Sequence, residues 1–311
     1  MEEINKSEIS EIARKMGKFI IINFLVELIF TIFINDYLAN LLHSYGPLSK
    51  SDPIEIDMLV RSSTHGLNSI IVGIFIFKPN IKDIFSNKNQ IYKLSLKLKT
   101  KLTIFFISMA LLSTIPSSFI MVTYTKLDIP MPETAVILSI FAIFTTPFIE
   151  EILNRGIILN QLKGIGYLFS IIISSVYFGS IHGIGFFHAF IIGLILGAAC
   201  ILTGNIRWPI IIHLIYNLTL PLIEEVFLRL FPNVSYRVGK LIIAIILLLI
   251  FLVISRRDKE IKKINIRINI KDIVSEFKKD KEKYLTFITE PIITVIIMSW
   301  IFIQLISVLV M

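Results

Sequence analysis

The sequence contains few cysteines and few charged residues for its length. Cys200 is the only cysteine among 311 residues, which excludes an intrachain disulfide and a metal site built on a Cys-x-x-Cys pair. Charged residues make up 17% of the chain and hydrophobic residues 55%, whereas an average soluble domain has about 25% charged residues. Because the apolar residues are gathered in runs, the composition indicates a membrane protein rather than a large soluble core.

We also expect no cleavable signal peptide. The chain begins with a mixed-charge, amphipathic segment, and the apolar run that follows is long enough to cross a membrane. We therefore expect this run to remain in the protein as its first spanning helix.

The apolar runs predict an all-α fold, a polytopic transmembrane helical bundle with about 8–9 spanning helices. Each spanning helix needs about 20 mainly apolar residues. The count is eight if the second run, with Arg61 and His65 near one end, does not span. The runs lie near residues 17–35, 58–77, 102–124, 134–161, 166–183, 185–203, 208–228, 239–255 and 291–310.

Basic residues predict the orientation of the bundle. Residues 78–101 contain seven lysines and residues 256–283 contain eleven Lys or Arg, whereas 36–57 and 125–133 contain one lysine each. The positive-inside rule then places both basic segments and the N-terminus in the cytoplasm. Since these bases flank apolar runs, the net charge of +8 fits lipid headgroups better than nucleic acid. We expect the connection 256–290 to be a solvated linker, with lipid contact as the alternative.

The fourth run contains an unusual group of charged residues. Glu150, Glu151 and Arg155 lie where an ionisable side chain costs about 2.5–3.5 kcal/mol. Glu151 and Arg155 are four residues apart, so they share a helix face and can pair, while Glu150 points about 100° away. The spacing predicts a neutralised carboxylate at Glu151 and a free one at Glu150, suited to general-base chemistry. The alternative is a structural network of all three.

Two further polar pairs follow at four-residue spacing, Phe178 with His182 and His213 with Asn217. His182 can share a water molecule with Glu150 and act as a proton shuttle. His213 and Asn217 can both donate hydrogen bonds, which suits a developing oxyanion. For each pair the alternative is a structural hydrogen bond between helices. The remaining histidines, His43, His65 and His188, are expected to be structural or interfacial.

These motifs carry a family resemblance. Glu-Glu-x-x-x-Arg at 150–155, Phe-x-x-x-His at 178–182 and His-x-x-x-Asn at 213–217, in that order, resemble the CAAX protease and bacteriocin-processing (CPBP, or Abi) family of intramembrane proteases, related to type II CAAX prenyl endopeptidases. Residues 202–209 are similar to the run that precedes the last motif in that family. The resemblance covers about 140–222.

The resemblance implies a role for each matching residue. Glu150 and His182 would activate water, and His213 and Asn217 would form the oxyanion hole. Peptide hydrolysis would then proceed by direct water attack without an acyl-enzyme. The residues expected to support the site are Glu151, Arg155 and Phe178.

The resemblance leaves the need for a metal open. Members of the family have been described both as metalloproteases and as metal-independent glutamate proteases. No metal is required on the favoured interpretation, although Glu150, His182 and His213 could ligate zinc and leave one position for water. Asn154 departs from the aromatic or aliphatic residue usual in the family, which is expected to alter the packing beside the salt bridge.

The predicted organisation is a catalytic helical core at 134–228, on helices four to seven, between N-terminal helices at 1–133 and a C-terminal part at 229–311. The function expected is that of an intramembrane endopeptidase in a bacterial or archaeal cell membrane. Its partners would be a peptide or lipidated-peptide substrate and membrane lipids, with a possible role in peptide maturation or bacteriocin self-immunity. The alternatives are a non-catalytic immunity or scaffold protein and an ion-coupled transporter.

Two observations complicate this interpretation. Residues 221–229 repeat the Pro-x-Ile-Glu-Glu-x-x-x-Arg pattern of 147–155 without the glycine that follows it, and we expect this copy to lie at the membrane interface. The predicted helix boundaries also place His182 near the outer end of its helix and His213 near the inner end of another. A shared site therefore requires shifted boundaries or a broken helix around residues 183–185.

Overall fold

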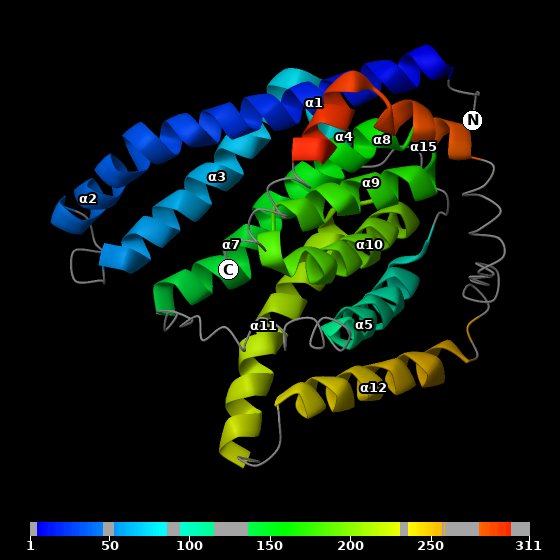
Figure 1. Cartoon of the computed structure of the whole chain (residues 1–311). Helices are drawn as coiled ribbons and strands as arrows, with labels where there is room; N and C mark the ends of the chain where they lie inside the picture. The colour runs from blue at the N-terminus through cyan, green and yellow to red at the C-terminus, as the bar shows by residue number, and fades with distance from the viewer. Residues whose placement is uncertain are drawn as a thin grey trace.

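The computed structural model describes residues 5–45, 53–85, 94–114, 136–230, 236–256, 258 and 280–299. The regular structure of these residues is helical throughout, which confirms the all-α prediction (Figure 1). Most of the connection 256–290 and the ends of the predicted helices 102–124 and 291–310 lie outside the described residues. The elements are α1 (Lys6–Ile29), η1 (Phe30–Ile34), α2 (Asn35–Tyr45), α3 (Pro53–Phe77), α4 (Ile81–Phe85), α5 (Leu96–Leu112), α7 (Val136–Glu151), η2 (Ile152–Leu159), α8 (Asn160–Leu162), α9 (Tyr167–Ser180), η3 (Gly183–Gly185), α10 (Phe186–Thr203), α11 (Arg207–Leu230), α12 (Tyr236–Ser255) and α15 (Lys281–Ile288).

Four helices within the described residues are long and apolar enough to cross a membrane. They are Lys6–Ser44, Ile56–Phe77, Phe186–Thr203 and Val238–Ser255, and α9 is a shorter apolar helix. The chain is therefore an integral membrane protein, and the second apolar run, left open above, meets the length and composition of a span. The total of eight or nine spans stays a prediction.

Capping residues set the helix ends where chain direction changes. The Asn5 side chain accepts a hydrogen bond from the backbone N–H of Glu8 at 3.0 Å, and Ser95 likewise caps α5. These short polar side chains satisfy N–H groups that have no partner within the helix. At the other end of α10, Gly204 adopts a left-handed conformation with φ of 66°, a conformation that glycine takes without a steric penalty.

The helices pack around two hydrophobic clusters. One is centred on Phe19 and Ile157, where α1, α3, η2 and α9 meet, and the other on Phe106, where α5 meets α10, α11 and α12. Successive residues of α9 belong to different clusters, Tyr177 to the first and Phe178 to the second. Helix α9 therefore lies between the two parts of the core, with α10 along its length (Figure 1).

The charged ends of several helices gather on one side of the molecule. Lys101 at the start of α5 binds the Ile254 carbonyl at the end of α12, and it pairs with Asp258. Lys6 at the start of α1 pairs with Glu282 on α15 at 3.0 Å. The start of α1, α15, the start of α5 and the end of α12 lie on the same side of the view in Figure 1. The placement of the basic segments and the N-terminus in the cytoplasm stays a prediction.

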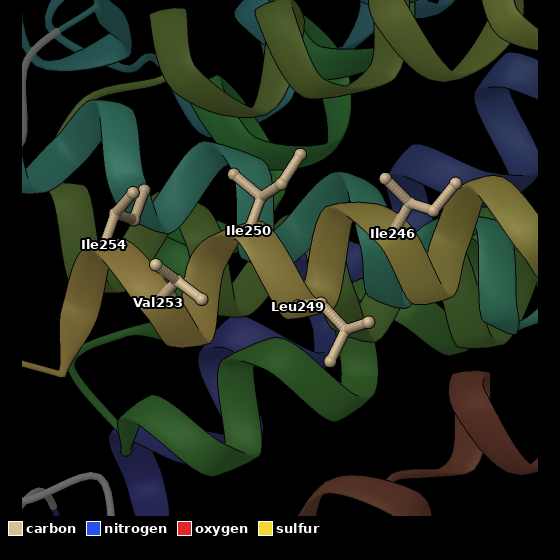
Figure 2. A pocket seen from close by; sticks show the side chains of 5 residues that line it. All are labelled: Ile246, Leu249, Ile250, Val253 and Ile254. Carbon is tan, nitrogen blue, oxygen red and sulfur yellow. The ribbon is translucent and has the colours of Figure 1, made fainter.

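The outer face of α12 is apolar and exposed. Figure 2 shows its side chains along a shallow hollow, and Val253 and Leu249 are 74% and 55% exposed. Such a face would be unfavourable in water and is suited to contact with lipid tails. The residues that line the hollow are Ile246, Leu249, Ile250, Val253 and Ile254.

Candidate active site

The acidic motif lies where the fourth predicted helix changes its winding. Helix α7 ends at Glu151 and continues as the π-helix η2 from Ile152. The Asn154 side chain donates a 2.8 Å hydrogen bond to the carbonyl of Glu150, the acceptor that an α-helix would give to the backbone N–H of Asn154. A side chain that takes a ladder acceptor competes with regular helix, and π-helical turns are frequent at functional sites. Asn154 therefore acts on the backbone of Glu150 itself.

Glu151 and Arg155 form the buried support of the site. Both side chains are fully buried, and Arg155 Nε lies 3.1 Å from a carboxylate oxygen of Glu151 without hydrogen-bond alignment. The guanidinium donates from Nη2 to the carbonyl of Gly193 on α10 at 3.1 Å, and its carbon lies 4.8 Å from the centre of the Phe178 ring. A buried guanidinium must be paired and hydrogen-bonded. Arg155 finds these partners on α9 and α10, and it thereby joins η2 to both helices.

Glu150 faces two histidines, one in the turn after α9 and the other on α11. Its carboxylate oxygens lie 3.8 Å from Nε2 of His182 and 3.7 Å from Nε2 of His213. The Glu150 side chain is 18% exposed, whereas that of Glu151 is completely buried. The two neighbouring acids therefore differ in environment, and Glu150 is the more exposed of the two.

The hydrogen bonds of the two imidazoles determine which nitrogen is open. His182 Nδ1 lies 2.6 Å from the carbonyl of Phe178, and His213 Nδ1 lies 3.1 Å from a carboxylate oxygen of Glu151. Both partners are acceptors, so each Nδ1 must donate its hydrogen, and in the neutral ring Nε2 keeps a lone pair. Both Nε2 atoms face the Glu150 carboxylate. At these separations a shared donor such as water can bridge the acceptors.

A break after α9 brings His182 to the level of His213. Helix α9 ends at Ser180, so the predicted helix 166–183 is too long, and His182 precedes the short 3₁₀ turn Gly183–Gly185. Gly183 has φ of 52°, in the left-handed region that glycine tolerates best. Of the two explanations considered for the difference in depth, the structure shows shifted boundaries together with a break at 183–185.

The aromatic ring of Phe178 packs between the charged groups. It is 2% exposed, and its centre lies 4.6 Å from the His182 ring and 6.1 Å from the His213 ring. Asn217 lies one turn after His213 on α11 and is half-buried. The structure thus brings Glu150, Glu151, Arg155, Phe178, His182 and His213 together, with Asn217 on the adjoining turn.

Several other polar groups were considered in the sequence or contact the site. His188 lies in the first turn of α10, and its Nε2 atom is 2.7 Å from the Tyr216 hydroxyl. A hydrogen bond of this kind is expected of a structural histidine. The side chains of Glu224 and Glu225, in the second copy of the acidic motif, lie outside the described residues. The sequence did not predict the hydrogen bond of Asn154 to the Glu150 carbonyl. It also did not predict the bond of Arg155 to the Gly193 carbonyl, because local spacing reveals no acceptor 38 residues away.

The spacing of Glu150, His182 and His213 can be compared with that of metal ligands. Among the residues that the structure describes, no group of three or more His, Cys, Asp or Glu side chains converges as a metal site. A tetrahedral zinc site with bonds of about 2.0–2.1 Å would hold its ligand atoms about 3.4 Å apart, closer than the 3.7 and 3.8 Å at Glu150. As placed here, Glu150, His182 and His213 are spaced more widely than the ligands of a tetrahedral zinc ion.

Comparison with known families agrees with the motif-based recognition. Residues 132–219 match the family of type II CAAX prenyl endopeptidase Rce1-like proteins. The match is to a protease family, and it includes every residue assigned to the site from sequence. Comparisons with curated proteins and with solved structures find no match to the chain.

Proposed function

We propose that the chain is an intramembrane endopeptidase that hydrolyses a peptide bond in or beside the bilayer. The observation that carries the proposal is the position of the Glu150 carboxylate, 3.8 Å from Nε2 of His182 and 3.7 Å from Nε2 of His213, while Nδ1 of each ring faces another acceptor. The Glu150 carboxylate and Nε2 of His182 are two proton acceptors that can hold a water molecule and remove its proton. The match of residues 132–219 to a protease family supports the same chemistry.

In the proposed mechanism Glu150 and His182 take a proton from the bound water as its oxygen attacks the carbonyl carbon. The carbonyl oxygen becomes an oxyanion, which is stabilised by donors at His213 and Asn217. The proton then passes to the amide nitrogen, the carbon–nitrogen bond breaks, and a carboxylic acid and an amine are released. No acyl-enzyme forms, since water is the nucleophile.

The oxyanion function requires His213 to carry a hydrogen on Nε2. Since Nδ1 already donates to Glu151, His213 can donate from Nε2 only as an imidazolium. The carboxylate of Glu151 favours that cation in the same way as the acid of a catalytic triad favours its imidazolium. We assign Glu151, Arg155 and Phe178 to holding the site together rather than to the reaction.

The substrate that we propose is a peptide or lipidated peptide that reaches the site from the membrane. Exposed apolar faces such as α12 keep the protein in the bilayer. Peptide maturation and bacteriocin self-immunity in a bacterial or archaeal cell membrane, with a cytoplasmic N-terminus, are the physiological roles that we propose.

A peptide-cleavage assay in liposomes tests the proposal. We expect the variants Glu150→Ala, His182→Ala and His213→Ala to lose cleavage, and the Glu224→Ala control to retain it. Unchanged cleavage in the first three variants would overturn the mechanism. If a Glu150→Ala protein still protects its cell against a bacteriocin, the chain is a non-catalytic immunity or scaffold protein. If solute flux depends on Glu224 as much as on Glu150, the chain is a transporter.

A further inference from the structure

A second polar cluster lies between α1 and α3, outside the site described above. Asn23 and Glu27 are four residues apart on α1, and His65, Asn68 and Ser69 follow at three- and four-residue spacing on α3. This spacing places each set on one helix face, and the two helices are in contact. A carboxylate oxygen of Glu27 lies 3.3 Å from Nδ1 of His65, which joins the two sets.

Most of this cluster is buried, and several of its atoms have no partner. Asn23, Asn68 and Ser69 are 7%, 6% and 1% exposed. Within the described part of the chain, no hydrogen-bond partner lies near Asn23 Oδ1, Asn68 Nδ2, Ser69 Oγ or the second oxygen of Glu27. Buried polar groups in proteins are almost always hydrogen-bonded to protein or to ordered water. A cluster of four such atoms therefore indicates a ligand.

The chemistry of the four atoms identifies that ligand as water. Asn23 Oδ1 and the Glu27 oxygen are acceptors, Asn68 Nδ2 is a donor, and the Ser69 hydroxyl is both. A cation would satisfy only the acceptors, and an anion only the donors. Water donates two hydrogen bonds and accepts two, so a few water molecules can satisfy the whole set.

The exposed end of the cluster lies close to the helix that carries Glu150. The His65 side chain is 46% exposed and that of Glu27 is 18% exposed, so the cluster is open at one end and buried at Ser69. At Gly66 the two helices α3 and α7 come so close that a Cβ would lie 2.4 Å from the Ile149 side chain. His65 and Glu150 are the chain neighbours of these two residues, so the end of the cluster at His65 lies near the helix turn that carries Glu150.

We propose that Asn23, Glu27, His65, Asn68 and Ser69 hold a chain of water molecules that supplies the nucleophile to Glu150. The supply role rests on the proposed function, because each peptide bond hydrolysed consumes one water molecule that the surrounding apolar helices cannot replace. The water-binding role is independent of it. These five residues are positioning residues, since they act on the reaction through water.

The first test measures water access at Ser69 whether or not the protein is a protease. Ser69→Cys is made in a Cys200→Ala background, reconstituted in liposomes and treated with silver ion, a thiol reagent of nearly the size of water. The matched control is Ser108→Cys, at a fully buried serine whose hydroxyl binds the Phe105 carbonyl. We expect the thiol at 69 to react at least about tenfold faster than that at 108, because buried thiols are inert. Equal rates would overturn the proposal.

The second test measures peptide hydrolysis. Asn68→Leu removes the donor and fills the space with an apolar side chain, so we expect kcat to fall about tenfold, the equivalent of one net hydrogen bond, with KM unchanged. Asn68→Ser, which keeps a polar group and leaves room for water, should restore most of kcat. A reactive thiol at 69 with unchanged kcat in Asn68→Leu would overturn the supply role. A reactive thiol in a protein without any hydrolysis would overturn the proposed function and leave the water site standing.

Discussion

The Nδ1 atom of His213 lies 3.1 Å from a carboxylate oxygen of Glu151, 62 residues earlier in the chain. The other oxygen of this carboxylate lies 3.1 Å from Arg155. Glu151 therefore fixes the tautomer of His213 and compensates a buried guanidinium at once, and it leaves the His213 Nε2 atom facing Glu150. The two adjacent acids therefore have different roles, Glu151 in structure and Glu150 in the proposed reaction.

We expect Glu150→Gln and Glu151→Gln to fail in different ways. Glu150→Gln should lower hydrolysis by about 10²–10⁴-fold, the usual contribution of a general base, with little change in thermal stability. Glu151→Gln leaves the fully buried Arg155 without its counter-charge, which typically destabilises a protein by about 3–5 kcal/mol. Thermal unfolding in detergent and peptide hydrolysis are measured together. Equal melting temperatures for the two variants would show that the acids are not divided as described.

His182→Asn separates the two nitrogens of that imidazole. The asparagine amide reaches the position of Nδ1 and can still donate to the Phe178 carbonyl, the 2.6 Å contact of the native ring, but it has nothing at Nε2. We expect hydrolysis to fall at least about 10²-fold with an unchanged melting temperature. His43→Asn, on α2 and outside the site, is the control and should hydrolyse as the native protein does. Retained hydrolysis in His182→Asn would exclude the Nε2 atom from proton transfer.

Some of this architecture could be predicted from the sequence because it depends on local spacing. The four-residue interval between Glu151 and Arg155 and the angle to Glu150 follow from helix geometry alone. The all-α fold follows equally directly from the length of the apolar runs. In these cases the interacting groups lie within about one turn of each other.

Other features could not be predicted because they depend on distant partners or on competing hydrogen bonds. The π-helix after Glu151 accompanies a side-chain bond from Asn154 to a backbone carbonyl, and an apolar pattern of period 3.6 does not reveal such a change. The acceptor of Arg155 is Gly193 on another helix. His65, interpreted as structural or interfacial, is joined to Glu27 only by the packing of α1 on α3.

Gly193 offers a test of the support of Arg155. A Cβ at this position would lie 2.9 Å from the Ser175 side chain and 3.0 Å from its Cα, so α9 and α10 are too close for alanine. We expect Gly193→Ala to destabilise the protein by about 1–3 kcal/mol through overpacking, and to lower kcat because the Gly193 carbonyl holds Arg155. At Gly185 the nearest atom to a Cβ lies 3.8 Å away, so Gly185→Ala is the matched control. A Gly193→Ala protein as stable and active as Gly185→Ala would contradict the close packing of α9 on α10.

Removal of divalent metals distinguishes the proposed mechanism from a zinc-dependent one. The Nε2 atoms of His213 and His182 lie 3.7 and 3.8 Å from the carboxylate oxygens of Glu150, wider than the ligand spacing of tetrahedral zinc, and Glu150 is assigned to proton transfer. We therefore expect prolonged dialysis against a chelator to leave both hydrolysis and the melting temperature unchanged. A zinc site would respond in both measurements, because a bound metal stabilises the folded state as well as supplying the reaction. Loss of hydrolysis that added zinc restores, accompanied by a lower melting temperature of the stripped protein, would replace the Glu150 mechanism with a metal-based one.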